Sequence, residues 1–305
     1  MAIEKVSVIG LGALGILFGN QLSKRIPKQN LSFIADRERV NKYQSEGIYC
    51  NDERCDFNFE TPDEATSPAD LIIIAVKYNG LQKALDMIKH HVGEDTIILS
   101  ALNGISSEEI IGQRYGFEKV LFCVAQGMDA VKEGNKLTYK NAGMLSFGER
   151  EPNMISEKVE RVAEFFEEMD FPYELETHML KRQWGKFMLN VGVNQTVAVY
   201  ESNYAEIQKH GKARVTMIAA MREVIQLSEQ EGIYLTEADL DYWLDILATL
   251  NPDGKPSMRQ DLEAKRYSEV QLFAGTVLEL GKKHSIPTPI NRELYEKIKL
   301  IENQY

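Results

Sequence analysis

Apolar and polar positions in the first half of the chain form short apolar runs separated by segments of helical periodicity. The runs predict strands over residues 6–9, 31–34, 71–76, 96–100 and 120–124, with helices beginning at Ala13, near Gly80 and at Ser107. Residues 71–76 show no polar alternation, as expected of a strand that is buried on both faces. The pattern predicts βαβ units wound into a mostly parallel sheet, with residues 71–76 near its centre.

The pattern changes along the second half of the chain. Residues 136–139 and 144–147 predict a hairpin, followed by a helix over 156–169 and a strand at 173–175. From His178 onward we find only helical periodicity, over residues 179–199, 212–231, 237–247, 260–284 and 292–302. We therefore predict an α/β chain with an N-terminal Rossmann-like dinucleotide-binding domain at residues 1–176. An all-α domain is predicted at residues 177–305.

Composition narrows the possible partners. The formal charge is −11 over 305 residues and no basic run offsets it, so neither a nucleic acid nor an anionic membrane is an expected partner. No segment is apolar over the length of a membrane helix, and glycines interrupt the stretch after Lys5 that could resemble a secretory signal. Cys50, Cys55, Cys123 and the five histidines show no metal-ligand spacing. We expect a cytoplasmic protein without a metal site.

A glycine motif joins the first predicted strand to the first predicted helix. It runs Gly10, Leu11, Gly12, Ala13, Leu14, Gly15. In a dinucleotide-binding turn the first glycine permits a tight turn, the second lets the backbone approach a pyrophosphate, and the third allows close packing of helix and strand. The helix N-terminus then holds the anion. All six residues are therefore expected to bind the cofactor.

Three polar residues share one face of the helix predicted over residues 179–199. Lys186, Asn190 and Asn194 are spaced by four residues, which places them in one stripe over about two turns. Asparagine is a mediocre helix former, and the neighbouring residues are too apolar for an exposed helix. The stripe therefore indicates a site that offers one cation and two amides to a small oxygen-rich ligand, rather than a solvated helix face.

Five segments together resemble the ketopantoate reductase family, the NADPH-dependent 2-dehydropantoate 2-reductases. They are Gly10 to Gly15, Lys77 after the central strand, Leu102-Asn103-Gly104, the segment from Trp184 to Asn194, and Ser257 to Asp261 with Glu269 beyond it. The resemblance spans nearly the whole chain. It implies a helical second domain like the C-terminal domain of 6-phosphogluconate dehydrogenase, which serves substrate binding and dimerisation. It also implies the reduction of a 2-keto acid by hydride transfer.

The resemblance also implies catalytic and substrate-binding roles. Lys186 is expected to be the general acid that protonates the carbonyl oxygen, because desolvation lowers the pKa of a lysine from about 10.4 toward the useful range. Glu269 is implied as a partner of that lysine, the substrate hydroxyl and the nicotinamide end of the cofactor. Asn190 and Asn194 are expected to bind substrate. Ser257 matches the position that binds the substrate carboxylate, although residues 256–260 also resemble a capping box with Ser257 as N-cap.

Three further positions follow predicted strands. Asn103 and Lys77 lie where open α/β sheets bind ligands. The resemblance implies that both residues lie near cofactor and substrate, with Asn103 contacting both. An ordinary Asn-Gly turn and an exposed lysine are the alternatives. Ala130 is implied to touch the cofactor through its backbone.

Two positions depart from the family pattern. Asp36 stands where NADPH-dependent members typically have an arginine, and an acid there normally binds a ribose 2′-hydroxyl and repels a 2′-phosphate. Arg37 and Arg39 could still supply charge to a phosphate, so NADP and NAD both stay open. Tyr204 stands where an asparagine that recognises pantoate is expected. Its phenol could bind the same hydroxyl or reshape the pocket for an apolar side chain.

The sequence leaves three functions open. The first is a 2-dehydropantoate 2-reductase that makes D-pantoate in pantothenate biosynthesis. The second, favoured by Asp36 and Tyr204, is an NAD-dependent D-2-hydroxyacid dehydrogenase of the same family, acting on branched or aromatic 2-keto acids. The third is a non-catalytic dinucleotide sensor, which the presence of Lys186 and Glu269 disfavours. Because members of the family are often dimeric, a homodimer is expected.

Overall fold

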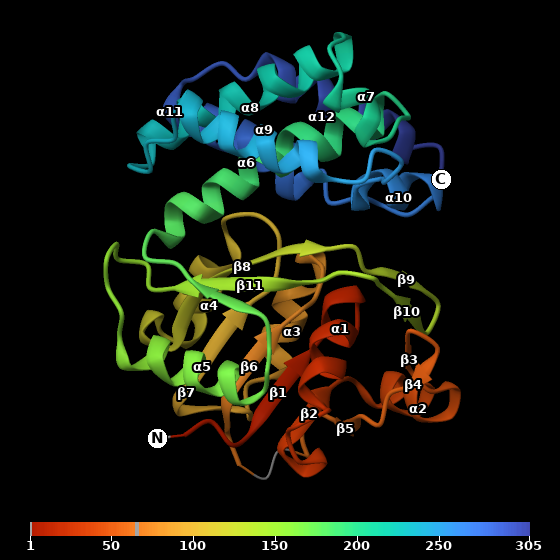
Figure 1. Ribbon diagram of the computed structural model, residues 1–305, viewed down its shortest axis with the longest axis vertical. Coiled ribbons are helices and arrows are strands. Elements are labelled where there is room, and N and C mark those ends of the chain that lie inside the picture. The colour runs from red at the N-terminus through yellow and green to blue at the C-terminus, as the bar shows by residue number, and fades with distance from the viewer. Residues whose placement is uncertain (1, 65–66) are drawn as a thin grey trace. The chain divides into compact units, whose positions relative to one another are not determined.

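The computed structural model describes residues 2–64 and 67–305, and its contacts divide the chain into two units, Met1–Met179 and Leu180–Tyr305. Unit 1 contains an eight-stranded sheet with the order β12-β11-β8-β7-β6-β1-β2-β5 (Figure 1). Unit 2 is formed by helices. The predicted fold class, a Rossmann-like α/β domain followed by a helical domain, is confirmed.

The large sheet is parallel over six of its strands. These are β1 (Val6–Ile9), β2 (Leu31–Ile34), β5 (Asn58–Glu60), β6 (Ala69–Ile74), β7 (Val92–Ser100) and β8 (Val120–Met128). Then β11 (Ala142–Gly148) runs antiparallel to β8, and β12 (Tyr173–Leu175) runs parallel to β11. The predicted strands at residues 6–9, 31–34 and 173–175 are confirmed with their bounds.

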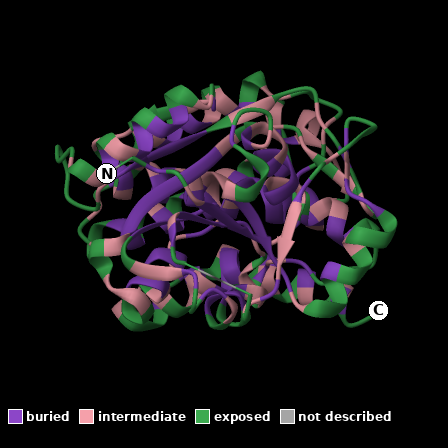
Figure 2. Cartoon of the chain, turned by 90° about the horizontal axis from the view of Figure 1, so that it is seen from below, coloured by how far each residue is buried: buried purple, intermediate pink, exposed green. Residues whose placement is uncertain are grey.

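Helices cover both faces of the sheet. The side chains of α1 (Ala13–Leu22) and α5 (Glu157–Glu168) share a core with Val8 and Ile73. On the other face α3 (Leu81–Met87) and α4 (Ser107–Tyr115) share a core with Ile9 and Ile72. Buried residues accordingly fill the strands in Figure 2. This double cover explains why residues 71–74 of β6 are apolar without alternation.

The predicted hairpin of residues 136–139 and 144–147 is wrong. The first segment forms β10 (Lys136–Thr138), which belongs to a second sheet with the order β4-β3-β10-β9. The other strands of that sheet are β3 (Tyr49–Cys50), β4 (Glu53–Arg54) and β9 (Val131–Glu133). The second segment lies in β11 and pairs with β8. The alternation along each segment was compatible with several partners, and β3, about 90 residues earlier, supplies one that local pattern does not reveal.

Several elements of unit 1 were not predicted from the pattern. Besides β3, β4, β5 and β9, they include α2 (Arg37–Glu46), whose only fully buried residue is Val40, and two 3₁₀ turns, Lys28–Asn30 and Phe117–Lys119. A further 3₁₀ turn, Tyr78–Gly80, precedes α3 where the helix was expected to begin.

Unit 2, all of which the structure describes, contains helices and no strand. Its helices are α6 (Met179–Val199), α7 (Tyr204–Gln208), α8 (Lys212–Gln230), α9 (Glu237–Thr249), α10 (Ser257–Glu263), α11 (Thr276–His284) and α12 (Pro289–Glu302). The predicted helix over residues 179–199 is confirmed with its bounds. None of the helices in the described part of the chain combines the length and the apolar character that a membrane-spanning helix requires.

The single helix predicted over residues 260–284 is wrong, because the chain breaks after α10. Lys265 adopts a φ of +51°, and the N–H of Arg266 donates to the carbonyl oxygen of Asp261 at 2.8 Å, which closes the helix end. A π-helical turn, Gln271–Gly275, then leads into α11. The capping box at Ser257 is also wrong, since Pro256 is the N-cap and Ser257 is the first helical residue.

Candidate functional site

The glycine turn between β1 and α1 has the geometry that its three glycines predict. Gly10 adopts a φ of +100°, and a Cβ there would lie 2.5 Å from the carbonyl oxygen of Ala75. A Cβ on Gly15 would overlap the carbonyl oxygen of Gly10, so only glycine lets α1 pack this closely on the turn. Gly12 differs, because the nearest atom to a Cβ would be the Ala75 oxygen at 3.7 Å. The backbone at Gly12 is therefore open to close approach.

The N-terminus of α1 suits an anion. Gly12 is its N-cap, no side chain caps the helix, and its first turn holds no acidic residue. The first N–H groups of a helix lack partners within the helix, and the helix dipole favours negative charge beside them. The turn from Gly10 to Gly15 therefore fits the pyrophosphate of a dinucleotide.

The structure brings most of the predicted cofactor residues to one edge of the sheet in unit 1. In the register Ile9 pairs with Ile34 and Ile74, and Ile74 pairs with Ser100. Since these strands are parallel, the residues after them share an edge: the glycine turn, Asp36, Lys77 and Asn103. β1 lies between β2 and β6, so the chain reverses its winding direction there, which is where open α/β sheets bind ligands. Ala130 follows β8 and is half-buried against the core under α1.

Asp36 lies in a group of charges at the end of β2. Its carboxylate caps α2 by accepting the N–H of Arg39 at 3.0 Å, and Lys83 Nζ lies 3.0 Å from Asp36 Oδ2. The Arg39 N–H and the Lys83 ammonium hold the pKa of Asp36 below its usual range. Arg37 turns instead to Glu64, with 2.6 Å between the charged groups. Lys83, which belongs to α3, could not be predicted from the sequence pattern.

Asn194 presents an unused acceptor on the stripe of α6. Its Nδ2 donates to Asn190 Oδ1 at 3.3 Å. Asn194 is only 6% exposed, and its Oδ1 has no hydrogen-bond partner among the described residues. Lys186 and Asn190 are half-buried on the same helix face. A buried carbonyl oxygen without a donor is costly, so this site suits a ligand that carries a hydroxyl group.

Two glycines fix the rotation of α6. A Cβ on Gly185 would overlap the indole nitrogen of Trp243 in α9, and a Cβ on Gly192 would crowd Met221 in α8. These glycines are seven residues apart and share a face that α8 and α9 approach closely. At about 100° per residue, the stripe lies roughly 100° to 180° around the helix from that face. The polar stripe of Lys186, Asn190 and Asn194 therefore lies outside the surface of α6 that packs against α8 and α9.

Tyr204 and Ser257 belong to neighbouring segments of unit 2. The N–H of Tyr204 donates to the carbonyl oxygen of Gly254 at 3.0 Å, and the ring of Tyr204 lies close enough that a Cβ on Gly254 would be 3.0 Å from it. Burial raises the pKa of Tyr204 to about 12, so its hydroxyl stays a donor at neutral pH. Ser257, three residues beyond Gly254, is exposed at the start of α10.

Glu269 lies two residues before the π-helical turn, whose N-cap is Val270. Its carbonyl oxygen accepts the N–H of Leu272 at 2.9 Å, and the N–H of Gly275 donates to Val270 at 3.1 Å, five residues back. Turns of this kind are frequent at functional sites. Ser268 is anchored by Glu302, which accepts its N–H at 2.8 Å and its hydroxyl at 2.6 Å. Neither the π-helical turn nor the contact between Ser268 and Glu302 could be predicted from the pattern of apolar residues.

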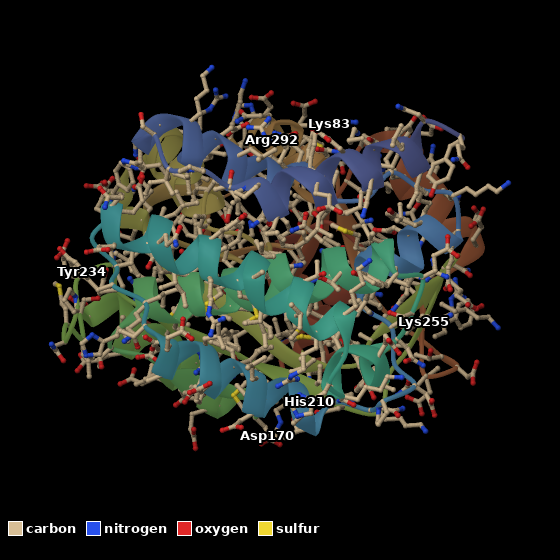
Figure 3. All side chains as sticks on the ribbon, turned by 90° about the horizontal axis from the view of Figure 1, so that it is seen from above. Lys83, Asp170, His210, Tyr234, Lys255 and Arg292 are labelled. Atoms are coloured by element: carbon tan, nitrogen blue, oxygen red, sulfur yellow. The ribbon has the colours of Figure 1, made fainter. Side chains whose placement is uncertain are left out.

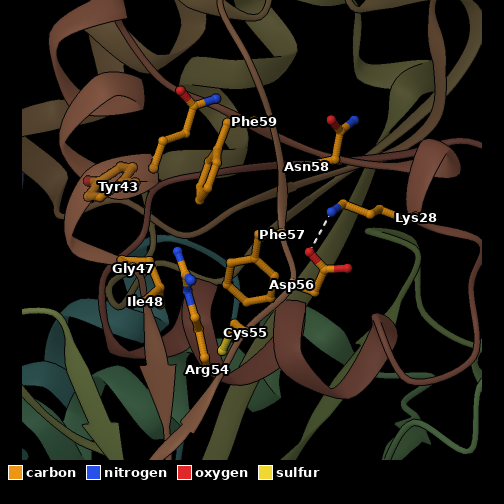
Figure 4. Close-up of a pocket in the computed structure, with 11 residues that line it drawn as sticks. Lys28, Tyr43, Gly47, Ile48, Arg54, Cys55, Asp56, Phe57, Asn58 and Phe59 are labelled. Atoms are coloured by element: carbon orange, nitrogen blue, oxygen red, sulfur yellow. Dashed lines mark hydrogen bonds and ion pairs between the residues drawn. The ribbon is translucent and has the colours of Figure 1, made fainter.

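A separate pocket of about 460 Å³ lies in unit 1, lined by Lys28, Tyr43, Arg54, Phe57 and Phe59 among others (Figure 4). The Lys28 ammonium at its rim is paired with Asp56. The predicted site residues, all of which the structure describes, do not line this pocket. Among the described residues, no group of three or more His, Cys, Asp or Glu side chains could hold a metal ion.

Several solved structures share the fold over nearly the whole chain. A PanE/ApbA family ketopantoate reductase from Ralstonia eutropha JMP134 has a TM-score of 0.85 at 23% identity, covering 98% of this chain and 99% of that one. A D-mandelate dehydrogenase solved with NADH and anilino(oxo)acetate has a TM-score of 0.85 at 22% identity, with the same coverage. A dimeric ketopantoate reductase from Staphylococcus aureus has a TM-score of 0.79 at 20% identity, again covering 98% and 99%.

Sequence comparison identifies the family. The chain is 26% identical over 305 residues to a 2-dehydropantoate 2-reductase of Aquifex aeolicus (strain VF5), covering 98% of this chain and 97% of that one. It is 25% identical over 299 residues to one of Streptococcus pyogenes serotype M1, covering 96% of each. Residues 6–152 match the family described as "Ketopantoate reductase PanE/ApbA", and residues 178–302 match "Ketopantoate reductase PanE/ApbA C terminal". The resemblance found in the sequence is confirmed, and the chain belongs to the ketopantoate reductase family.

Proposed function

We propose that this protein reduces a 2-keto acid to a 2-hydroxy acid with a reduced nicotinamide dinucleotide, and that the substrate is 2-dehydropantoate, which becomes D-pantoate in pantothenate biosynthesis. The unpaired, buried Oδ1 of Asn194, on the helix face that it shares with Lys186, carries the proposal. It offers an acceptor for a substrate hydroxyl on a face that also carries a cation. The names of the Aquifex and Streptococcus relatives support the choice of substrate.

In the proposed binding of the cofactor, the turn from Gly10 to Gly15 holds the pyrophosphate on the N-terminus of α1. Asp36 and Arg37 lie at the end of β2, where the adenosine ribose binds in such folds. Lys77, Asn103 and the backbone of Ala130 line the path toward the reacting end. A bound nicotinamide would supply the hydride.

In the proposed reaction, Lys186 protonates the carbonyl oxygen as negative charge develops on it. The substrate carbon gains a hydride and its oxygen gains the lysine proton, which solvent then replaces. Asn190 and Asn194 bind the substrate hydroxyl through their amides, and Glu269 orients the Lys186 ammonium and that hydroxyl. In this proposal Ser257 binds the carboxylate, and Tyr204 shapes the pocket for the rest of the acid.

A second candidate, an NAD-dependent D-2-hydroxyacid dehydrogenase of the same family, is favoured by two observations. Asp36 carries a negative charge where a 2′-phosphate would lie. Tyr204 is a neutral phenol that replaces the expected asparagine, and it can accommodate an aromatic or branched substrate. The fold likeness to the D-mandelate dehydrogenase solved with NADH agrees with this alternative.

One assay compares the candidates. Oxidation of NADPH and of NADH is followed with 2-dehydropantoate, 2-ketoisocaproate and phenylglyoxylate, and kcat/KM is measured for each pair. The proposal predicts the highest value for 2-dehydropantoate. A preference for NADH with the bulkier acids would favour the second candidate. Binding of a dinucleotide without turnover of any of the three acids would contradict both candidate enzymes and favour a non-catalytic dinucleotide sensor.

We also propose that the protein is a homodimer, as the Staphylococcus aureus ketopantoate reductase is described to be. Light scattering on the eluting peak of a sizing column measures the mass directly. A mass of twice 34.7 kDa is expected, and the mass of a single chain would contradict the proposal.

A further inference from the structure

One ion pair spans the edge of the sheet that carries the glycine turn. Asp36 follows β2, whereas Lys83 belongs to α3, which follows β6. β2 and β6 are the two neighbours of β1. The contact of 3.0 Å between Lys83 Nζ and Asp36 Oδ2 therefore joins the elements on either side of β1, at the edge where the glycine turn begins.

Both oxygens of Asp36 already accept hydrogen bonds. Oδ1 accepts the N–H of Arg39 at 3.0 Å, and Oδ2 accepts from Lys83 at 3.0 Å, with Arg39 Nε 3.8 Å away. An acid that selects NAD normally uses its oxygens to bind the ribose 2′-hydroxyl. Here the negative charge is offset by Lys83 and the cap on α2 uses one oxygen. The Lys83 ammonium therefore weakens the repulsion that Asp36 alone would exert on a 2′-phosphate.

Lys83 has donors to spare, and the Nη2 of Arg37 is engaged by Glu64 and Thr61. An ammonium group has three N–H donors, and the structure assigns one of those of Lys83 to Asp36. The Lys83 side chain is 65% exposed and reaches the surface (Figure 3). Arg37 is bound to Glu64 at 2.6 Å, and Glu64 is fixed in turn by the N–H of Thr61 at 2.8 Å.

We propose that Lys83 determines the choice of dinucleotide. Its ammonium offsets the charge of Asp36 and also contacts the 2′-phosphate, so that the site prefers NADPH although an acid stands at the end of β2. This inference rests on the proposed function, because it concerns the cofactor of that reaction. It identifies Lys83 as a residue that determines cofactor specificity. Lys83 lies in α3, outside both the glycine motif and the end of β2.

The test is direct titration of NADPH and NADH, without substrate, by nicotinamide fluorescence. Lys83→Met removes the charge and keeps the aliphatic stem. We expect it to raise the Kd of NADPH about tenfold or more, and that of NADH by less than about twofold. Lys89→Met is the matched control, since Lys89 is also exposed but follows the opposite end of α3. It should change neither Kd. Equal weakening of both dinucleotides by Lys83→Met, or an unchanged NADPH Kd, would overturn the inference.

A second variant separates contact from charge compensation. Asp36→Asn removes the charge and keeps a residue that caps helices well, so it should tighten NADPH relative to NADH. In that background Lys83→Met should still weaken NADPH, because the lysine contacts the phosphate itself. If the double variant binds NADPH with the same Kd as Asp36→Asn alone, the proposed contact between Lys83 and the 2′-phosphate is refuted.

The outcome is distinguishable from a failure of the proposed function. If the wild-type protein binds neither dinucleotide, the proposed function fails and this inference with it. If the wild type binds and oxidises a reduced dinucleotide but its preference does not respond to Lys83, this inference alone fails.

Discussion

Replacement of Gly12 by alanine should separate cofactor binding from folding. Gly12 has a φ of −74°, which alanine adopts readily, and a Cβ would meet only the Ala75 oxygen, at 3.7 Å. Alanine loses less entropy on folding than glycine but is a poorer N-cap, so the two effects oppose each other. We therefore expect the free energy of unfolding to stay within about 1 kcal/mol of the wild-type value.

The same methyl group should weaken dinucleotide binding strongly. It would occupy the space through which the pyrophosphate approaches the N-terminus of α1. Loss of one hydrogen bond to a charged group costs about 1.5–3 kcal/mol, which corresponds to a rise in Kd of roughly 10-fold to 150-fold. Fluorescence titration with NADPH and NADH measures the Kd, and urea unfolding measures the stability of the same preparations.

Gly15→Ala is the matched comparison. Its Cβ would overlap the backbone oxygen of Gly10, which no side-chain rotation can relieve. The variant should lose both affinity and about 3 kcal/mol of stability, a typical upper value for overpacking. If Gly12→Ala binds both dinucleotides with the wild-type Kd, the pyrophosphate does not approach Gly12 and the geometry argued from this turn is refuted. Equal destabilisation by the two variants would refute it as well.

Two further predictions concern stability. Burial holds the pKa of His91 below its usual value of 6.5, so the unfolded chain takes up the proton first and stability should fall as the pH drops below about 6.5. Urea unfolding at successive pH values measures how steeply the free energy of unfolding changes with pH. His91→Leu should make this change less steep, and the exposed control His90→Leu should not. Equal pH dependence in the wild type and both variants would contradict the assignment of the effect to His91. Glu302, which is 1% exposed on its side chain, accepts the N–H and hydroxyl of Ser268 and pairs with Lys299 at 2.6 Å. Glu302→Ala should therefore lower the free energy of unfolding by about 2–3 kcal/mol, and Glu302→Gln, which keeps an acceptor oxygen, should lower it less; equal losses would show that the anchoring of Ser268 is not the cause.

Elements with a strong apolar period were predictable from the sequence. The strands at residues 6–9 and 31–34 are apolar and buried, and α6 is marked over 21 residues by large buried side chains. By contrast, α2 has a single fully buried residue, Val40, so it has no apolar stripe to detect. The second sheet depends on the pairing of β10 with β3, about 90 residues earlier in the chain, which no local pattern specifies.

The candidate site was predictable where a residue type is required by backbone geometry. Gly10 and Gly15 stand where any side chain would collide with the turn, and Lys186, Asn190 and Asn194 share a face because of helical periodicity alone. What the sequence did not reveal depends on tertiary contact. Lys83 meets Asp36 only because β2 and β6 flank β1, and the π turn after Glu269 follows a helix end closed by hydrogen bonds. The roles assigned to these residues stay predictions.

The general-acid role of Lys186 is tested most directly by single-turnover hydride transfer in Lys186→Ala. The variant is loaded with NADPH, mixed with 2-dehydropantoate, and the loss of nicotinamide fluorescence is timed. Loss of a general acid should slow the chemical step by about 10²-fold to 10⁴-fold, with the Kd of NADPH within about twofold of the wild-type value. A variant that transfers hydride at the wild-type rate would contradict the proposed mechanism.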